Sequence, residues 1–225
     1  MSMPFYVPAE QIVKDRAEFA QKGIARGRSL IAAIYDEGVL LVAENPSSSL
    51  NKISEIYDRI AFGGVGRYNE FDRLREAGIR WADLTGYEYS REDVDAQELA
   101  NFYAQYLGSS FSEGPKPLEV EVVVAQLAER KKQSKIYHVA YEGTISDEGR
   151  FAVIGGDAES IRARFAEQGG DVADLTSTVR RAVAALSGPD RILHAEDLEI
   201  GLLAQSEARR KFTRLSDERV TALLP

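Results

Sequence analysis

The sequence predicts an α+β fold of four layers, in which two packed antiparallel sheets lie between layers of helices in an αββα sandwich. Runs of strands alternate with pairs of helices, whereas a parallel sheet would alternate single strands with single helices. Short turns that contain glycine join neighbouring strands, and such turns make the strands antiparallel. The hairpin at residues 29–43 is apolar on both faces, so another layer must cover each face.

This hairpin is predicted to be the structural centre of the chain. Its two runs, residues 29–35 and 39–43, are nearly continuous in Leu, Ile, Val and Ala, and Asp36-Glu37-Gly38 joins them. A glycine beside acidic turn formers, between two β-rich runs, is a strong hairpin signal. We therefore expect both strands in the middle of a sheet.

A helix is predicted before the hairpin, from Pro8 to Lys22, with Gly23 as its end. Proline suits the first helical turn and glycine suits the position after a helix. Its apolar residues fall on one stripe: Ala9, Ile12, Val13, Ala17 and Ala20. An amphipathic helix in this place could pack on its own sheet or contact a neighbouring subunit, and the residues alone leave both uses open.

The remaining elements follow from apolar periodicity and from turn residues. Asp95 and Glu98 form the pattern of a capping box at the start of the second helix after the hairpin. One domain, residues 1–225, is predicted. After the hairpin come strands at 53–57 and 60–65 and helices at 68–84 and after 95. A strand at 118–127 follows, and strands at 136–141 and 151–155 are expected to continue its sheet. Helices at 158–167 and 171–186, strands at 198–204 and 211–215, and a short helix from Ser216 complete the chain.

Composition excludes several classes of function. With 28 basic and 36 acidic residues the 225-residue chain carries a net charge of −8, which is a poor match to a nucleic acid. The absence of cysteine removes disulfides, thiol nucleophiles and thiolate metal sites, and fits a reducing compartment. Neither a secretory signal nor an apolar run of about 20 residues is visible. We therefore expect a cytoplasmic protein with no nucleic-acid and no membrane partner.

No catalytic group, cofactor or metal site emerges from the motifs. Gly64 and Gly66 resemble part of a dinucleotide-binding turn, but Asn69 stands where the third glycine belongs and no βαβ unit surrounds it. His138 and His194 are the only histidines, and two isolated imidazoles without thiolates do not indicate a zinc site. The residues alone thus predict no catalytic residue.

One long run does resemble a known family. The segment KGIARGRSLIAAIYDEGVLLVAENPSSSLNKISEIYDRIAFGGVGRYNEFDRL closely resembles proteasome α subunits of the actinobacterial type. The resemblance covers essentially the whole chain. It implies the αββα sandwich of the N-terminal-nucleophile hydrolases, which agrees with the order of elements read from the residues.

The resemblance also implies a subunit without catalytic activity. Catalytic β subunits of that family expose an N-terminal threonine at the first core strand. Here Gly27-Arg28-Ser29 fills the matching place, and more than twenty residues precede it. The alternatives are an active threonine hydrolase of the same fold, and a dinucleotide-binding enzyme that uses Gly64 and Gly66.

The family assigns the following roles to matching positions. The helix at 8–22 would contact the neighbouring α subunit in a seven-membered ring, and the helix at 68–84 would face the β ring. Lys52 and Gly27 would bind the C-terminal tail of a ring-shaped ATPase or another activator. Unfolded protein substrates would pass a gate formed by Met1, Ser2, Met3, Pro4, Phe5, Tyr6, Val7 and Pro8.

Overall fold

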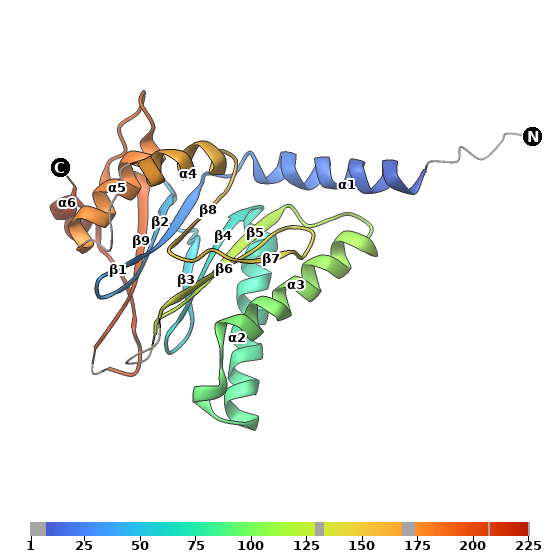
Figure 1. Cartoon of the computed structure of the whole chain (residues 1–225), viewed down its shortest axis with the longest axis horizontal. Coiled ribbons are helices and arrows are strands. Elements are labelled where there is room, and N and C mark those ends of the chain that lie inside the picture. Colours follow the sequence, from blue (N-terminus) through green and yellow to red (C-terminus); the bar gives the residue numbers. More distant parts are fainter. Residues whose placement is uncertain (1–7, 129–132, 168–173, 207, 225) are drawn as a thin grey trace, which may run out of the picture.

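The computed structural model describes residues 8–128, 133–167, 174–206 and 208–224. Two five-stranded antiparallel sheets lie face to face, with helices on the outside, as the sequence predicts (Figure 1). The predicted gate residues 1–7 lie outside the described residues, and Pro8 is the first residue placed.

The predicted hairpin forms the middle of the first sheet, whose strand order is β10-β9-β2-β1-β8. Strand β1 is Leu30–Tyr35 and β2 is Gly38–Glu44; every residue of β2 is buried. Two neighbours complete β2's side of the sheet, β9 at Leu198–Ala204 and β10 at Phe212–Arg214. The central position of the hairpin is therefore confirmed.

The second sheet has the order β3-β4-β5-β6-β7. Its strands are β3 (Ile53–Tyr57), β4 (Ile60–Gly66), β5 (Val120–Gln126), β6 (Lys135–Val139) and β7 (Ile145–Asp147). The three-residue β7 was not predicted, because so short a run carries no clear alternation.

One assignment of a strand to a sheet was wrong. Residues 151–155 were expected to continue the sheet of residues 136–141, but β8 (Phe151–Ile154) pairs with β1 in the first sheet. The turn at Glu148 and Gly149 carries the chain across, and Gly149 takes the left-handed conformation with φ +63°. Alternation places side chains inside or outside, but it does not say which of two packed sheets a strand joins.

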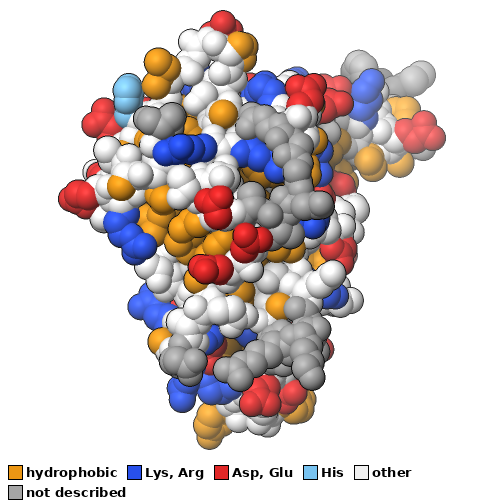
Figure 2. Space-filling view, turned by 60° about the vertical axis from the view of Figure 1, so that its left-hand side comes forward, with side chains coloured by type: hydrophobic (Ala, Val, Ile, Leu, Met, Phe, Trp, Pro, Cys, Tyr) orange, Lys and Arg blue, Asp and Glu red, His pale blue; other side chains and the backbone are white. Residues whose placement is uncertain are grey.

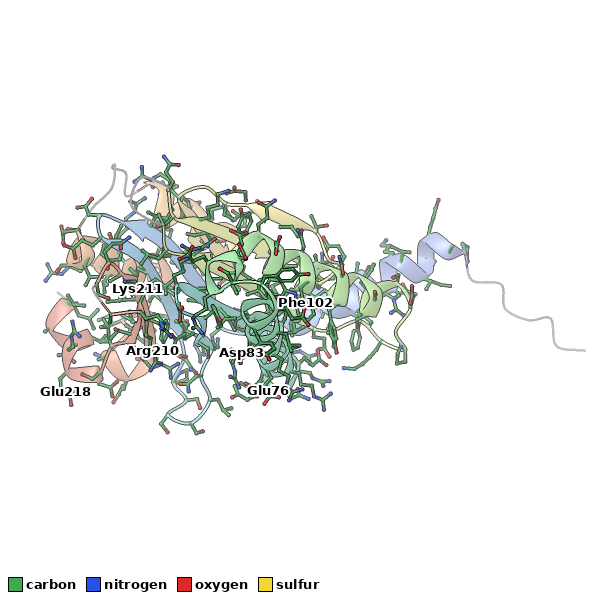
Figure 3. All side chains as sticks on the ribbon, turned by 90° about the horizontal axis from the view of Figure 1, so that it is seen from below. Glu76, Asp83, Phe102, Arg210, Lys211 and Glu218 are labelled. Atoms are coloured by element: carbon green, nitrogen blue, oxygen red, sulfur yellow. The ribbon has the colours of Figure 1, made fainter. Side chains whose placement is uncertain are left out.

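Helices cover the outer face of each sheet. On the second sheet these are α2 (Tyr68–Glu88) and α3 (Ala96–Ser112), and Asp95 caps α3 as predicted, accepting a bond from Gln97 N at 2.7 Å. In Figure 3 Phe102 of α3 lies close to α2, which carries Glu76 and Asp83. On the first sheet lie α4 (Ala158–Glu167) and α5 (Leu175–Ser187), with α6 (Asp217–Leu223) beside α5.

Three apolar clusters hold these layers together. One lies between each sheet and its helices, and the third lies between the two sheets and includes Leu30, Leu41, Ile53 and Val123. Two short 3-10 helices complete the described elements, η1 at Arg91–Asp93 and η2 at Ala195–Asp197. No helix within the described ranges is both long and apolar enough to cross a membrane.

Helix α1 (Ala9–Ile24) extends away from the body of the molecule. Figure 1 shows this from the side, and in the space-filling view of Figure 2 the helix stands out at the upper right. The prediction that this helix ends at Gly23 was wrong, because the helix continues to Ile24. Gly23 lies inside the helix at a place where Glu119 packs so closely that a side chain on residue 23 would collide with its carboxylate.

Candidate functional site

The predicted tail-binding lysine lies immediately before β3, beside the first strand of the core. Lys52 is half-buried, and its ammonium Nζ donates a hydrogen bond to the carbonyl oxygen of Arg28 at 2.6 Å. Burial lowers the pKa of Lys52 to about 8, and the positive charge of Arg28 lowers it as well. The carboxylates of Glu44 and Glu199 act in the opposite direction and raise that pKa.

The backbone around Lys52 is fixed by a carboxylate from the other sheet. Glu199 of β9 is buried, and its oxygens accept hydrogen bonds from Lys52 N at 2.7 Å and from Ile53 N at 3.2 Å. The Asn45 amide donates to the same carboxylate at 2.8 Å, and Arg214 lies 3.3 Å from it. Because a carboxylate that accepts several N–H bonds is well satisfied when buried, Glu199 ties the two sheets together at this point.

A second buried carboxylate lies on the same side of the hairpin. Glu44 of β2 pairs with Arg28, and the guanidinium of Arg191 reaches both its oxygens, at 2.8 Å and 3.2 Å. Arg191 also donates to the carbonyl oxygen of Leu186 at 2.9 Å. The two buried carboxylates are thus surrounded by four cations, Arg28, Lys52, Arg191 and Arg214. The arginines are already paired with these carboxylates, so the half-buried ammonium of Lys52 is the cation best placed to bind a carboxylate ligand.

Gly27 lies near the ammonium of Lys52, because that ammonium bonds the carbonyl oxygen of Arg28, the residue after Gly27. A Cβ atom on residue 27 would lie 3.0 Å from Gly66 N and 3.0 Å from Val65 Cγ1. The absence of a side chain therefore lets the segment that enters β1 lie directly against the end of β4. The structure brings together the two residues predicted for the activator tail.

Gly27-Arg28-Ser29, the segment predicted to match the place of a catalytic threonine, ends in a buried, peptide-linked serine. Ser29 precedes β1 and is buried, and the chain runs from it through Gly27 into α1 without interruption. Behind it, Gly155 approaches Ser29 and Gly156 approaches the carbonyl of Ala25 so closely that side chains on either glycine would collide. The residues around the start of β1 are packed against the connection to α1.

The two glycines of the dinucleotide alternative serve packing. Gly64 lies under α2, where an added Cβ would be 2.8 Å from Cγ of Phe71, and Gly66 lies against the carbonyl of Glu119 with φ +111°. Strand β4, which carries both glycines, is antiparallel to β3 and to β5. This is not the parallel βαβ arrangement in which such glycines approach a pyrophosphate.

His138 contacts carboxylates of the protein itself. His138 of β6 lies between two carboxylates, with Nδ1 3.7 Å from Glu148 Oε1 and Nε2 3.8 Å from Glu121 Oε2. Contact with His138 and a 2.8 Å hydrogen bond from Arg162 lower the pKa of Glu148 to about 2, whereas burial raises the pKa of Glu121. Within the described ranges, no three His, Asp or Glu side chains are grouped so as to hold a metal ion.

His194, the other histidine, starts η2, and its backbone N–H donates to Asp197 at 3.0 Å. Its role is therefore in the local turn.

Comparison with known proteins decides the family. The family model described as Proteasome subunit matches residues 24–202 of this chain. The chain belongs to the proteasome subunit family. Three full-length relatives agree with this, and each is called Proteasome subunit alpha.

The relative from Acidimicrobium ferrooxidans is 54% identical over 224 residues, which cover 100% of this chain and 97% of that protein. The relative from a Nocardioides species is 51% identical and that from Thermobifida fusca 49% identical; each match covers 100% of this chain, and 90% and 91% of those proteins. The similarity to α-type proteasome subunits therefore includes α1 as well as the two sheets.

The sequence resemblance pointed to Lys52 and Gly27 of this proteasome subunit, and that role stays a prediction; the buried carboxylates around Lys52 were not predicted. Glu44 follows directly on the predicted strand 39–43, and Glu199 lies 147 residues from Lys52. A charged residue inside an otherwise apolar strand was the available signal for Glu199, because a buried carboxylate needs partners. Nothing in one sequence, however, says where those partners are.

Proposed function

We propose that this chain is the non-catalytic α subunit of a proteasome core particle, and that it forms the outer seven-membered rings, gates substrate entry and docks an activator. Its partners are neighbouring α subunits, β subunits that carry the catalytic threonines, a ring-shaped ATPase or another activator, and unfolded proteins in transit. The assembled particle acts in the cytoplasm.

The segment before β1 carries this proposal. A helix precedes the core strand on the same chain, and Ser29 is buried and peptide-linked. By resemblance, Gly27-Arg28-Ser29 matches the place where a catalytic subunit has a threonine with a free amine. The outer part of that helix is solvent-exposed in the single chain although it carries apolar side chains, with Ile12 47% and Val13 54% exposed. An exposed apolar helix face fits contact with a neighbouring copy in a ring.

The surroundings of Lys52 support activator docking. A tail that ends in a carboxylate would find the ammonium of Lys52 and the cation-rich surroundings of Glu44 and Glu199. A partly desolvated ammonium binds a carboxylate more strongly than an exposed one does. Gly27, next to the residue whose carbonyl Lys52 bonds, is the second position that we propose for contact with the tail.

Co-expression with the cognate β subunit tests the proposal. We expect a particle of stacked seven-membered rings by size measurement and electron microscopy. Deletion of residues 1–7 should then raise peptide hydrolysis by the assembled particle, because the entrance no longer closes. A particle in which the deletion leaves hydrolysis unchanged would count against the gate, and failure to assemble with the β subunit would count against the whole proposal.

Two further measurements separate the alternatives. An active threonine hydrolase would shorten itself to expose a threonine, so the intact mass of the chain from the assembled particle decides that case. A dinucleotide-binding enzyme would bind nicotinamide cofactors. A titration of the protein with these cofactors that gives no binding signal excludes a dinucleotide site at Gly64 and Gly66.

A further inference from the structure

The exposed part of α1 leaves the body of the molecule at Arg16. Every residue from 8 to 15 is exposed, and Arg16 and Ala17 are the first half-buried residues of the helix. Figures 1 and 3, seen from directions at right angles, both show α1 extending beyond the rest of the described structure. Whatever holds Arg16 therefore determines where the preceding two turns of helix point.

Arg16 is held by the C-terminal end of α3. Its Nε donates to the carbonyl oxygen of Phe111 at 2.6 Å, and its Nη2 donates to those of Ser110 at 3.0 Å and Gly114 at 2.8 Å. The guanidinium carbon also lies 5.9 Å from the centre of the Phe111 ring. The last carbonyls of a helix have no partner within the helix, and that end carries partial negative charge. A guanidinium fork satisfies both requirements at once.

The other contacts of α1 lie nearer to its C-terminal end. Ala20 and Ile24 are buried, Gln21 donates to the hydroxyl of Tyr141 at 3.0 Å, and Gly23 packs on Glu119. These contacts hold the last turns of the helix and leave Arg16 as the outermost tie to the body among the residues that the structure describes. At 1.5 Å per residue the helix from Ile24 to Ala9 is about 22 Å long, so a tilt of about 10° would move its far end by about 4 Å.

We propose that Arg16 is a positioning residue that fixes the direction of α1 by capping the C-terminal end of α3. This role rests on the proposed function above, because the direction of α1 matters only if that helix carries the ring contact and the gate. The bonds of Arg16 would then connect the helix layer on the second sheet with α1 and the gate residues that precede it. A change at the end of α3 would be transmitted to α1.

Spin labels can measure the direction of α1 because the chain contains no cysteine. The labels would be attached through Glu10→Cys on α1 and Glu98→Cys on α3, both exposed positions. Labelled chain would be diluted with unlabelled chain in the assembled particle, so that distances within one chain are read by double electron–electron resonance. The variants are Arg16→Gln, Arg16→Lys, and Lys14→Gln as a matched loss of an exposed cation from the same helix.

We expect a narrow distance distribution in the parent and in Lys14→Gln, and a distribution at least twice as broad in Arg16→Gln. Arg16→Lys should be intermediate, since an ammonium keeps the charge but cannot span three carbonyls as a planar fork does. If Arg16→Gln does not fold, Arg16→Lys alone decides. A distribution as narrow as that of the parent, in a folded Arg16 variant, overturns the proposal.

The thermal midpoint and the peptide hydrolysis of the same particles complete the test. A residue with a merely structural role would lower the midpoint without broadening the distribution, and that result also overturns the proposal. Broadened distances accompanied by raised basal hydrolysis support both proposals. Broadened distances with unchanged hydrolysis would support the role of Arg16 but contradict the gate, so failure of this inference and failure of the proposed function can be told apart.

Discussion

The ammonium of Lys52 lies 2.6 Å from the carbonyl oxygen of Arg28, the residue two positions before β1 begins. The lysine proposed for activator docking is thus bonded to the same backbone that connects α1 with β1. A tail carboxylate that draws this ammonium toward itself would compete with the Arg28 carbonyl. If a tail docks at Lys52 as proposed, docking and the position of the segment before β1 would be coupled through this hydrogen bond.

Replacement of Lys52 by alanine should weaken activator-stimulated degradation by about tenfold or more. A hydrogen bond between charged groups contributes about 1.5–3 kcal/mol, and the variant leaves the tail carboxylate without its cation. Assembly with β subunits and basal peptide hydrolysis should stay as in the parent. Lys22→Ala, which removes an exposed lysine from α1, is the matched control. Undiminished stimulation in Lys52→Ala would remove this residue from the docking site.

The affinity for the activator tail should fall as the pH rises through about 8, the lowered pKa of Lys52. Only the ammonium form attracts a carboxylate, so binding measured at about pH 9 should be weaker than at about pH 7. Titration of a tail peptide onto the assembled particle at several pH values measures this. An affinity that is the same at both of these pH values would contradict it.

The stability of the fold should respond to the same titration with the opposite sign. The pKa of Lys52 is about 8 in the folded protein, against 10.5 as its ordinary value, so between these values the unfolded chain binds more protons. Stability therefore rises with pH across that window. In the Lys52→Met variant this contribution should disappear, which unfolding by denaturant at pH values below and above the window can show. If that variant kept the parent's pH dependence, the titration would belong to another group.

Loss of the charge on Glu199 should destabilise the start of β3. In Glu199→Gln one oxygen acceptor becomes a donor that faces Lys52 N, Ile53 N or Asn45, so a buried bond is lost at a cost of about 1–3 kcal/mol. At about 2–4 °C per kcal/mol for a chain of this size, the thermal midpoint should fall by several degrees. Glu196→Gln, an exposed neighbour, should change it little.

Hydrogen exchange would locate the Glu199 effect. The amides of residues 52 and 53 should exchange faster in Glu199→Gln, whereas those of the β1–β2 ladder should not. Equal protection of all of them in the variant and the parent would show that the carboxylate does not anchor β3.

Glu148 should stabilise the fold at neutral pH and lose that effect in acid. Its pKa is lowered from 4.5 to about 2, so its contribution is complete above pH 4.5 and disappears as the pH falls toward about 2. Solvent reaches part of this side chain and screens its partners, so the contribution is on the order of 1–2 kcal/mol, less than the full shift would correspond to. The difference in unfolding free energy between Glu148→Gln and the parent should therefore be larger at neutral pH than at about pH 3.

The control for Glu148 is the exposed Glu159→Gln on α4. It should follow the parent at both pH values. A Glu148→Gln variant that is as stable as the parent at neutral pH would show that His138 and Arg162 contribute nothing through this carboxylate.

Local pattern was enough to predict most of the fold. The doubly apolar hairpin placed β1 and β2 at the centre, and helical periodicity found α2 to α5. What pattern could not supply was pairing over distance. It did not show that β8 crosses to the sheet of β1, because inward and outward alternation is the same in both sheets.

The candidate site shows the same division. Lys52 and Gly27 were available from a resemblance that is local in sequence, whereas Glu199 and Arg214 reach them across the packed sheets. Gly23 is a further case. Its position suggested a helix end, but it is required by the close approach of Glu119, a residue 96 positions away that no local pattern connects with it.

The placement of Glu199 has a consequence for quality control. Lys52 leads into the second sheet, but its backbone is fastened by a carboxylate of the first, so the proposed docking site exists only where both sheets have met correctly. In a subunit with one sheet misfolded, Glu199 would not hold the backbone of Lys52, and the subunit would bind a tail poorly. An activator that relies on this site would select properly folded rings before any substrate is committed to them.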